Sequence, residues 1–480
     1  MFKFWIKQTV LFFFSCNLLF GECLSKADTY DVIIVGGGVS GLSAANTLKQ
    51  NGVKKILVLE AADRIGGRVW TEDPWGSKIE MGASWISGIV NSPTFEIVKD
   101  MNLATQPTVY GHHCLACKMD SMAIYDQDGK RLSKEEVIQL QDNVSKFTEY
   151  LEELVSQKDN TSQAFNSLTF LDVLNDFSKK NKLSDPMYDK LYFALRLLVT
   201  YEMAVDLKDV SAHLGRLTAA SKVSGSDVVI PLGYNLVSSK LAKNTPIELN
   251  CTVTGINYDK QVVECTTNKG VYKAKNCIVT VPIGVLKAEK IAFSPPLPKG
   301  KLDAIATIQA GVFNKIYLLF PCTFWDDDLE WIESIPSPKN RDEIWDIMNF
   351  GKYFKQPILL AFTAGSFAKE VEKWSDEKTV DAIMTVLKKI YGENIPSPSS
   401  YRITRWGSNP LTLCSYSSPS LKPEMKTYVD FALPVKDRLF FAGEATSEAD
   451  GGMVYGAFIT GERAAKQVLE LMNGKNTPIN

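Results

Sequence analysis

The chain has 480 residues, of which 45% are hydrophobic and 22% are charged, with a formal net charge of −2. That length exceeds what a single hydrophobic core supports, and it predicts two domains. The hydrophobic content is that of an ordinary globular protein. A net charge near zero gives no indication of a nucleic-acid-binding surface or an acidic tail.

Residues 1–23 have the pattern of a secretory signal peptide. Two lysines precede an apolar stretch from Val10 to Phe20, and small residues follow between Gly21 and Cys23. The stretch is shorter than the roughly 20 residues that span a bilayer. We therefore expect cleavage near Cys23, no stable membrane span afterwards, and a secreted or secretory-lumen protein. An uncleaved signal anchor is the alternative.

The next segment predicts a dinucleotide site. Val32–Val35 is a short continuous apolar run, typical of a parallel strand covered on both faces. Gly36 permits a tight turn, Gly38 lets the backbone approach a pyrophosphate, and Gly41 lets a helix pack closely on the strand. Glu60 directly follows the next apolar strand, where an acid binds ribose hydroxyls and disfavours NADP. A glycine-rich turn without a ligand is the alternative.

A second glycine pair favours FAD over NAD. It stands between Arg64 and Arg68, where an arginine and free backbone N–H groups provide a further anion clamp for a large cofactor. Next along the chain, His112 and His113 precede Cys114 and Cys117. Two thiolates and a histidine suit a metal site, but a local disulfide or two separate thiols is favoured in an oxidising compartment. We predict no metal.

The middle of the chain predicts a helical region and then two sheets. Ser133 and Glu136 form a capping box before an amphipathic helix. Strands that return to the cofactor domain, and strands of a second sheet, follow after residue 225. The expected elements are helices at Thr169–Lys179, at Pro186 to about Met203 and at Ser375–Tyr391, and strands near Val228–Pro231, across Ile247–Val281, and at Lys315–Phe320 and Ile358–Thr363.

Lys315 is the residue that we expect to take part in chemistry. It stands in an alternating strand in which Phe313, Lys315 and Tyr317 share one face while Ile316 and Leu318 fill the other. Because both faces are apolar, the strand should be buried, and burial lowers the pKa of a lysine amine. A strand-edge lysine with its ammonium in water is the alternative.

The C-terminal segment has the same order of elements as the segment around Gly36: a buried strand, a glycine-rich turn and a helix. From Arg438 onward, a buried strand at Leu439–Ala442 leads through a glycine-rich turn into a helix that we expect to open at Gly456. A cofactor held by both ends of the chain predicts an enzyme.

These segments, with several ordered motifs between them, resemble the flavin-containing amine oxidases, a family of monoamine, polyamine and L-amino-acid oxidases. The chain is most similar to the polyamine oxidases. The motifs are EMGASW at 80–85, IVTVPIGVLK at 278–287 (read as a pair of strands), FSPPLP at 293–298, FNKIYLLF at 313–320 and RWGSNP at 405–410.

The resemblance implies an α/β fold, with a Rossmann-like FAD-binding domain interleaved with a substrate domain of mixed sheet and helices. We expect the signal peptide at 1–23, the FAD-binding domain at 29–95, 225–300 and 430–472, and the substrate domain at 96–224 and 301–429.

The resemblance also implies roles for individual residues. Lys315 would hold a water near flavin N5, and aromatic walls would align the amine, with plain core packing as the alternative for Trp406 and Tyr416. The expected substrate-binding residues are Trp85, Ser87, Tyr416 and Met453. The expected cofactor-binding residues are Gly36, Gly38, Ser40, Gly41, Glu60, Arg68, Gly82, Ala83, Ser84, Val253, Trp406, Gly443, Glu444, Gly452, Met453 and Val454.

The sequence departs from the family at several of these positions. Met453 replaces a second aromatic ring, and Ser87 and Val205 stand where plant polyamine oxidases carry acids. Ser415 aligns with the cysteine that holds flavin covalently in monoamine oxidases, and Cys414 is one residue off, so we expect noncovalent FAD.

The expected function is oxidation of amines, with polyamines in free or acetylated form as the expected substrates, by hydride transfer from the amine α-carbon to flavin N5. Oxygen is the second substrate, and aldehyde, a smaller amine and hydrogen peroxide are the products. An L-amino-acid oxidase, another amine oxidase, or a flavin-binding protein without turnover are the alternatives. The sequence does not indicate an oligomeric state.

Overall fold

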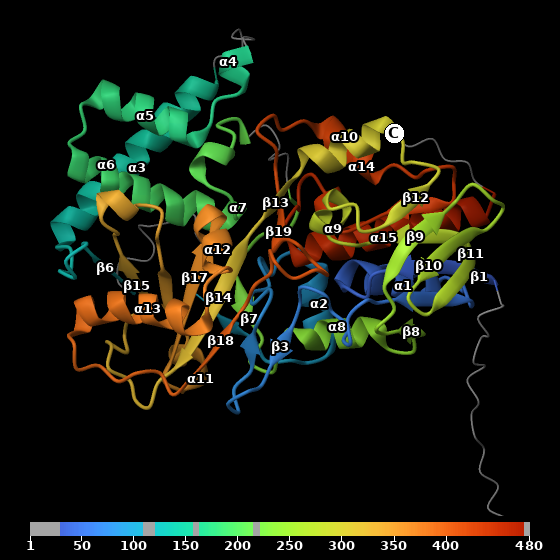
Figure 1. Ribbon diagram of the computed structural model, residues 1–480, viewed down its shortest axis with the longest axis horizontal. Helices are drawn as coiled ribbons and strands as arrows, with labels where there is room; N and C mark the ends of the chain where they lie inside the picture. The colour runs from blue at the N-terminus through green and yellow to red at the C-terminus, as the bar shows by residue number, and fades with distance from the viewer. Residues whose placement is uncertain (1–28, 109–120, 157–162, 215–220, 475–480) are drawn as a thin grey trace, which may run out of the picture.

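The computed structural model describes residues 29–108, 121–156, 163–214 and 221–474. The expected signal peptide and the group from His112 to Cys117 lie outside these residues. No helix in the described part of the chain is long and apolar enough to cross a membrane. Figure 1 shows two large sheets side by side along the long axis of the molecule.

The eight-stranded sheet is built from both ends of the chain. Its centre is β1 (Thr29–Val35), which pairs in parallel with β11 (Gly270–Val279) and β2 (Ile56–Leu59). The end of β11 also pairs in parallel with β20 (Leu439–Phe441). The remaining strands are β12 (Ala292–Ser294), β9 (Val253–Asn257) and β10 (Val263–Thr267) on the β11 side, and β8 (Ile247–Glu248) beyond β2.

Different helices cover the two faces of this sheet because β1 is apolar on both. Val32 and Ile34 pack on α1 (Val39–Gln50) and α15 (Val454–Met472), whose alanines allow a close approach. Ile33 and Val35 belong to a second core under α10 (Lys299–Thr307) and α14 (Met425–Ala432). Smaller helices nearby are α2 (Pro93–Asp100), α8 (Asn235–Ala242) and α9 (Ile283–Lys287).

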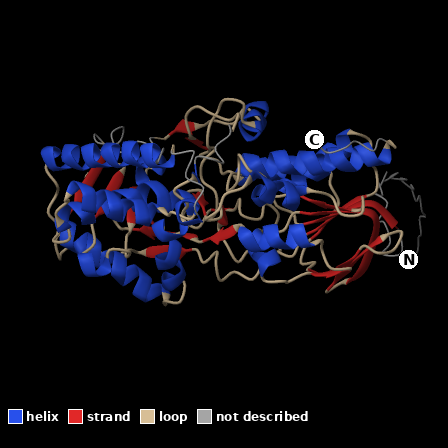
Figure 2. Ribbon diagram, turned by 90° about the horizontal axis from the view of Figure 1, so that it is seen from above, coloured by secondary structure: helices blue, strands red, loops and turns tan. Residues whose placement is uncertain are grey.

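The six-stranded sheet contains β14 (Phe313–Leu319), the strand that carries Lys315. Apolar residues of its opposite faces pack in two separate cores, one with Tyr317 and one with Ile316, as the alternating pattern predicts. Helices cover both faces of the sheet (Figure 2). The strands are, in order, β18 (Ser400–Ile403), β14 (Phe313–Leu319), β17 (Ile358–Ala364), β16 (Asp346–Asn349), β15 (Trp331–Ser334) and β6 (Met122–Tyr125).

The helical region forms largely where the sequence predicts it. The capping box of Ser133 and Glu136 is present, and a second box joins Thr169 to Asp172. The helix after Pro186 passes through a π-helical turn before it ends. The helices are α3 (Lys134–Val155), α4 (Gln163–Asn166), α5 (Phe170–Asn181), α6 (Asp185–Leu195), the π-helical turn (Arg196–Thr200), α7 (Tyr201–Met203), α11 (Gly351–Phe354), α12 (Gly365–Val371) and α13 (Asp376–Tyr391).

Three sequence-based expectations about elements are wrong in detail. Residues 278–287 are not a pair of strands, because β11 ends at Val279 and α9 follows. The strand expected near Val228 is β7 (Val228–Val229). It pairs with β5 (Gln106–Pro107) and not with the eight-stranded sheet. The last helix opens at Val454 rather than Gly456, because Met453 already has the extended backbone of an N-cap. The domain boundaries stay predictions.

Candidate active site

A single cavity of about 1270 Å³ runs between the two large sheets. It brings together all the predicted site residues except Gly41. Gly41 lies behind the turn, where an added Cβ would be 2.0 Å from the carbonyl oxygen of Gly36. Its role is therefore to let α1 pack closely on β1, as the sequence predicts, rather than to contact a ligand.

The glycine turn after β1 forms one end of the cavity. Gly36 has a φ of +111°, which favours glycine, and an added Cβ there would meet the hydroxyl oxygen of Thr280 at 2.6 Å. The second glycine pair lies against the first, since the Gly66 N–H donates to the carbonyl of Gly37 at 2.9 Å. Glu60 is buried beside them and accepts the Gly37 N–H at 2.5 Å. Two backbone turns and an acid thus meet at the N-terminus of α1.

Ser40, in the first turn of α1, is suited to a phosphate. The residue lines the cavity, and its hydroxyl oxygen is buried and has no hydrogen-bond partner among the described residues. A buried hydroxyl without a partner costs free energy unless a ligand or water bonds it. With the free N–H groups of the helix start, it forms an anion-binding end of the cavity.

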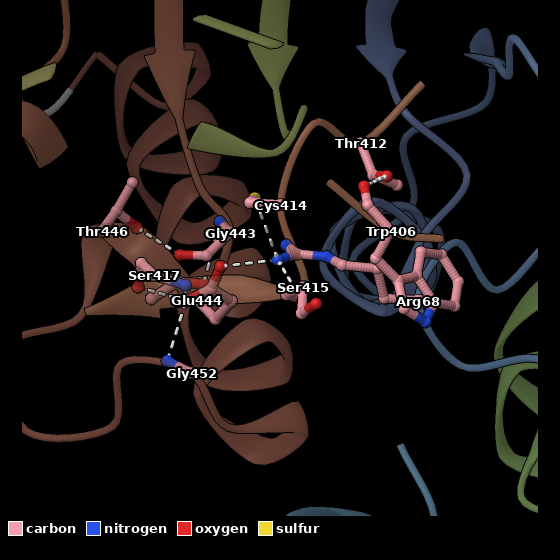
Figure 3. Close-up of polar contacts among 11 residues, drawn as sticks. Arg68, Trp406, Thr412, Cys414, Ser415, Ser417, Gly443, Glu444, Thr446 and Gly452 are labelled. Atoms are coloured by element: carbon pink, nitrogen blue, oxygen red, sulfur yellow. Dashed lines mark hydrogen bonds and ion pairs between the residues drawn. The ribbon is translucent and has the colours of Figure 1, made fainter. Parts of the chain in front are cut away.

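Arg68 and Glu444 join the first and last segments of the chain across the cavity (Figure 3). Arg68 Nη1 lies 2.9 Å from Glu444 Oε1 and donates to the Ser415 carbonyl at 3.0 Å. Glu444 Oε2 accepts the Gly452 N–H at 2.8 Å and the Ser417 hydroxyl at 2.5 Å. Burial lowers the pKa of Arg68, but the Glu444 carboxylate more than offsets this and holds it above its usual value. The ion pair fixes the glycine turn before α15.

Trp406 is held from three directions as a wall of the cavity. Its indole N–H donates to the Met81 carbonyl at 3.1 Å, and its backbone N–H donates to Asn314 Oδ1 at 3.0 Å. Trp70 meets the ring edge-on, with centroids 6.1 Å apart. The ring is buried and also lines the cavity, so it combines core packing with a surface for a ligand.

Lys315 reaches into the cavity from β14 and is only 4% exposed, which excludes a strand-edge lysine in water. Its Nζ lies 2.5 Å from both the Gly82 carbonyl and the Ser84 hydroxyl, and 3.0 Å from the Glu80 carbonyl. The ring of Trp85 lies 5.5 Å from Nζ. Burial lowers the pKa of Lys315, and the Glu80 charge offsets this in part.

Glu80 is a functional candidate that the sequence analysis missed. Its carboxylate is buried and accepts the Tyr234 N–H and the Thr71 hydroxyl, both at 2.8 Å. Burial raises the pKa of Glu80. The signal available in the sequence was its place at the head of the EMGASW motif, directly before the residues that bind Lys315.

A group of aromatic rings lines the same cavity as Lys315, and we call this part of the cavity the amine end. The ring centroid of Phe313 lies 5.9 Å from that of Tyr201 and 6.1 Å from that of Tyr416. The Tyr416 hydroxyl donates to the Tyr201 carbonyl at 2.8 Å. An added Cβ on Gly452 would lie 3.5 Å from the Tyr416 ring, so the turn that carries Met453 passes close to it.

Ser87 and Val205, which stand where plant polyamine oxidases carry acids, differ in their relation to the cavity. Ser87 lines the cavity, while Val205 is buried and does not. Glu202, three residues before Val205, does line it. Val253 lines the cavity as well, and it packs in the same core cluster as Ile291. No cluster of potential metal ligands occurs among the residues that the structure describes.

Comparison with known proteins identifies the family. A model of the flavin containing amine oxidoreductases matches residues 39–469. The chain belongs to this family. Polyamine oxidase 4 of Oryza sativa subsp. japonica is 34% identical over 445 residues, which are 91% of this chain and 88% of the relative. Polyamine oxidase 5 of the same organism is 33% identical over 450 residues, 92% of this chain and 88% of the relative.

A solved structure of putrescine oxidase bound to putrescine has the same fold. It superposes with a TM-score of 0.74 at 20% sequence identity and covers 92% of this chain and 99% of its own. Members of the flavin-containing amine oxidoreductases use FAD, held here without a covalent bond. The unpartnered Ser40 hydroxyl, the paired glycine turns and Glu60 fit its diphosphate and ribose.

Proposed function

We propose that the protein is an FAD-dependent oxidase of amines, with polyamines in free or acetylated form as its substrates. An aldehyde, a smaller amine and hydrogen peroxide are the products. The observation that carries the proposal is the continuity of one cavity from the phosphate-binding turn at Gly36 to the buried amine of Lys315. The family and the polyamine oxidase relatives support the same chemistry.

FAD supplies the acceptor for the hydride of the amine α-carbon, and the chain supplies position and environment. The rings of Trp85, Phe313 and Tyr416 confine an alkyl amine within an apolar wall. Burial keeps water from the reacting carbon and strengthens every electrostatic contact nearby. Proximity and electrostatics then account for most of the rate.

Lys315 acts as a neutral amine in this proposal. In the structure Nζ donates to the carbonyls of Glu80 and Gly82 and to the hydroxyl oxygen of Ser84. Burial lowers the pKa of Lys315 to about 7, so loss of one of these protons is accessible near neutral pH. In this state it adds no positive charge that would repel the substrate nitrogen. It can orient one water molecule, separate from the bulk solvent, if that water takes the place of the Ser84 contact.

The charge of the cavity favours an amine over an amino acid. An amino-acid substrate needs a cation for its carboxylate, and the cations among the described lining residues are Arg64, Arg68, Lys290 and Lys315. Lys290 is exposed, and Lys315 already donates to Glu80, Gly82 and Ser84. Arg68 is paired with Glu444, and Arg64 stacks on Trp70 at 4.4 Å from the ring centroid. The two arginines stand at the cofactor end.

A peroxide-coupled screen tests the proposal. Purified yellow protein should release hydrogen peroxide with spermine, spermidine or an acetylated form, and its absorbance near 450 nm should bleach when one of them is added without oxygen. Peroxide from L-amino acids alone would contradict the polyamine assignment. A bound flavin that bleaches with no amine would indicate a protein without turnover.

We also propose that the mature chain works in the secretory lumen or outside the cell. The charged and apolar pattern of residues 1–23 supports this. Expression of the full-length chain in a secreting host, followed by N-terminal sequencing of the product in the medium, tests it. An intact Met1 in a membrane fraction would contradict it.

A further inference from the structure

We propose that Asn250 is a site of N-linked glycosylation, which receives an oligosaccharide while the chain is transferred into the secretory lumen. The inference rests on the secretory location proposed above, and it adds a covalent modification that the oxidase function does not require. The acceptor sequence is Asn-X-Ser/Thr, in which X is not proline, and Asn250-Cys251-Thr252 has this form.

The sequence contains three such acceptor sequences, which begin at Asn143, Asn160 and Asn250. The pattern alone does not choose among them, because a chain of 480 residues contains several by chance. Asn160 lies outside the residues that the structure describes. The choice between the other two follows from exposure and from what each side chain already binds.

Asn250 is exposed in the turn between β8 and β9, beside an edge strand of the eight-stranded sheet. Its two hydrogen bonds within the described residues use backbone atoms. The N–H donates to the Ala62 carbonyl at 2.8 Å, and the carbonyl accepts Nδ2 of Asn268 at 3.1 Å. A sugar on the side-chain nitrogen of Asn250 would therefore break neither bond.

Asn143 is a poor acceptor by the same criteria. It is half-buried within α3, and its Nδ2 donates to the Gln139 carbonyl at 2.8 Å. The next residue, Val144, packs against two hydrophobic cores. A glycan on this nitrogen would disturb the helix bond and crowd the packed side of α3.

The turn explains the asparagine but not the threonine of the acceptor sequence. Asn250 has a left-handed φ of +51°, a conformation in which asparagine and aspartate are enriched. Thr252 contributes its backbone N–H, which donates to Asn268 Oδ1 at 2.8 Å. Any residue except proline could make that bond, so the hydroxyl of Thr252 is an additional feature that glycosylation requires.

The sugar must be attached before the sheet forms. In the finished fold Cys251 is buried, and its N–H donates to the Glu60 carbonyl at 2.8 Å, so an enzyme could not bind the acceptor sequence as an extended peptide. Because β20, which pairs with β11 in the same sheet, comes much later in the chain, Asn250 enters the lumen while the sheet is still incomplete.

The co-reactant is an oligosaccharide carried on a lipid diphosphate. The Nδ2 nitrogen of Asn250 forms a bond to the anomeric carbon of the first sugar. The bond from that carbon to the diphosphate oxygen breaks, and the lipid diphosphate leaves with the electron pair. Nδ2 gives up one proton to the solvent and keeps the other.

The test is a peptide map of the full-length chain, secreted by a eukaryotic host and purified from the medium as the holoenzyme. Peptide:N-glycosidase F, applied in water enriched in heavy oxygen, converts a glycosylated asparagine to a labelled aspartate. We expect the label at Asn250 in most copies, and faster migration on a denaturing gel after the treatment. Unmodified Asn250 in most copies would overturn the inference.

Matched variants separate the sugar from the turn. Asn250→Asp suits the left-handed turn but has no amide nitrogen, so it should lose the label and the gel shift while FAD content and turnover stay unchanged. Figure 1 shows β8 and β9 in the half of the molecule away from the six-stranded sheet, which supports this expectation. Thr252→Ala keeps Asn250 and should also lose the sugar. Asn143→Gln is the control and should keep it.

The outcomes separate this inference from the proposed location. Secreted protein that has lost its signal peptide but has no sugar at Asn250 would overturn the inference alone. The same holds if the gel shift persists in Asn250→Asp and disappears in Asn143→Gln. A chain that stays in the cytosol, without the label, would overturn the secretory location and this inference with it.

Discussion

Arg68 and Glu444 stand 376 positions apart in the sequence, and their Nη1 and Oε1 atoms lie 2.9 Å apart in the cavity wall. The pair ties the loop after β2 to the turn before α15. Both segments line the place where FAD binds, so the ion pair links cofactor binding to the contact between the N-terminal and C-terminal segments.

Replacing Glu444 by Gln should weaken both the fold and the cofactor site. Arg68 would lose its charged partner while it remains largely buried. We expect the free energy of unfolding to fall by about 2 kcal/mol, less than the roughly 3–5 kcal/mol of a fully buried pair, because the Arg68 side chain is 22% exposed. The measurements are the melting temperature and the ratio of FAD to protein. The control is Asp303→Asn, in the exposed Lys299–Asp303 pair, which should change neither the melting temperature nor the FAD content. Full FAD content in Glu444→Gln would show that the ion pair does not support the cofactor site.

Ser40→Ala should reduce FAD affinity without loss of stability. The hydroxyl has no partner among the described residues, so its removal breaks no bond within the protein. We expect the Kd for FAD to rise by about tenfold, measured by flavin fluorescence on the apoprotein. Ser43→Ala is the matched control, because that hydroxyl donates to the Phe458 carbonyl and its loss should lower the melting temperature instead. Equal effects of the two variants on FAD affinity would contradict the phosphate role.

Lys315→Met should slow turnover by roughly a hundredfold or more while FAD stays bound. The variant removes the buried amine but keeps an unbranched side chain of similar length in β14. Anaerobic bleaching and reoxidation by oxygen, measured separately by stopped flow, locate the half-reaction that needs the amine. Lys299→Met, at an exposed position, serves as the control. A variant with wild-type rates in both half-reactions would remove Lys315 from the mechanism.

Lys301 should make stability depend on pH. Its Nζ is buried between α10 and α14 and donates to the carbonyls of Asp430 and Phe431. Burial, and then the charge of Arg463, lower the pKa of Lys301 from 10.5 to about 7. Between those values the unfolded chain binds more protons than the native protein, so stability rises with pH across this window, by up to about 1.4 kcal/mol per unit.

Denaturant unfolding at pH 7, 8 and 9 measures that slope. Lys301→Met should remove part of it, because the titrating group is gone from both states. Lys422→Met, at an exposed site near α14, should keep it. Identical slopes in wild type and Lys301→Met would show that Lys301 keeps its proton in the fold.

The sequence was most informative where its local pattern reports burial directly. The apolar runs and glycines around Gly36 predict β1, α1 and β2 in the right order, and apolar neighbours on both faces predict the burial of Lys315. Here periodicity and turn chemistry agree with the tertiary structure, and no distant partner is needed to decide the element.

The rest could not be predicted because it depends on contacts between distant segments. Lys315 is bonded by residues more than 230 positions earlier, in a stretch without regular periodicity. The sequence predicts a strand after Val279, because a short run of β-branched residues does not distinguish a strand from a helix. In the structure, Gly284 lets α9 pack against the backbone of Leu413. A Cβ added at Gly284 would lie only 2.7 Å from the Leu413 carbonyl. The place of Glu202 depends on a π-helical turn, for which the sequence has no recognised signal.

β11 pairs with β1, from the start of the chain, and with β20, from near its end. During synthesis the ribosome must release β20 and α15 before the wall around Glu444 exists. A nascent or truncated chain that stops before residue 439 lacks the last strand of that wall and has no closed pocket for the flavin. FAD can therefore bind only after these segments have been synthesised, and yellow colour in a preparation reports that the chain extends through β20 and α15.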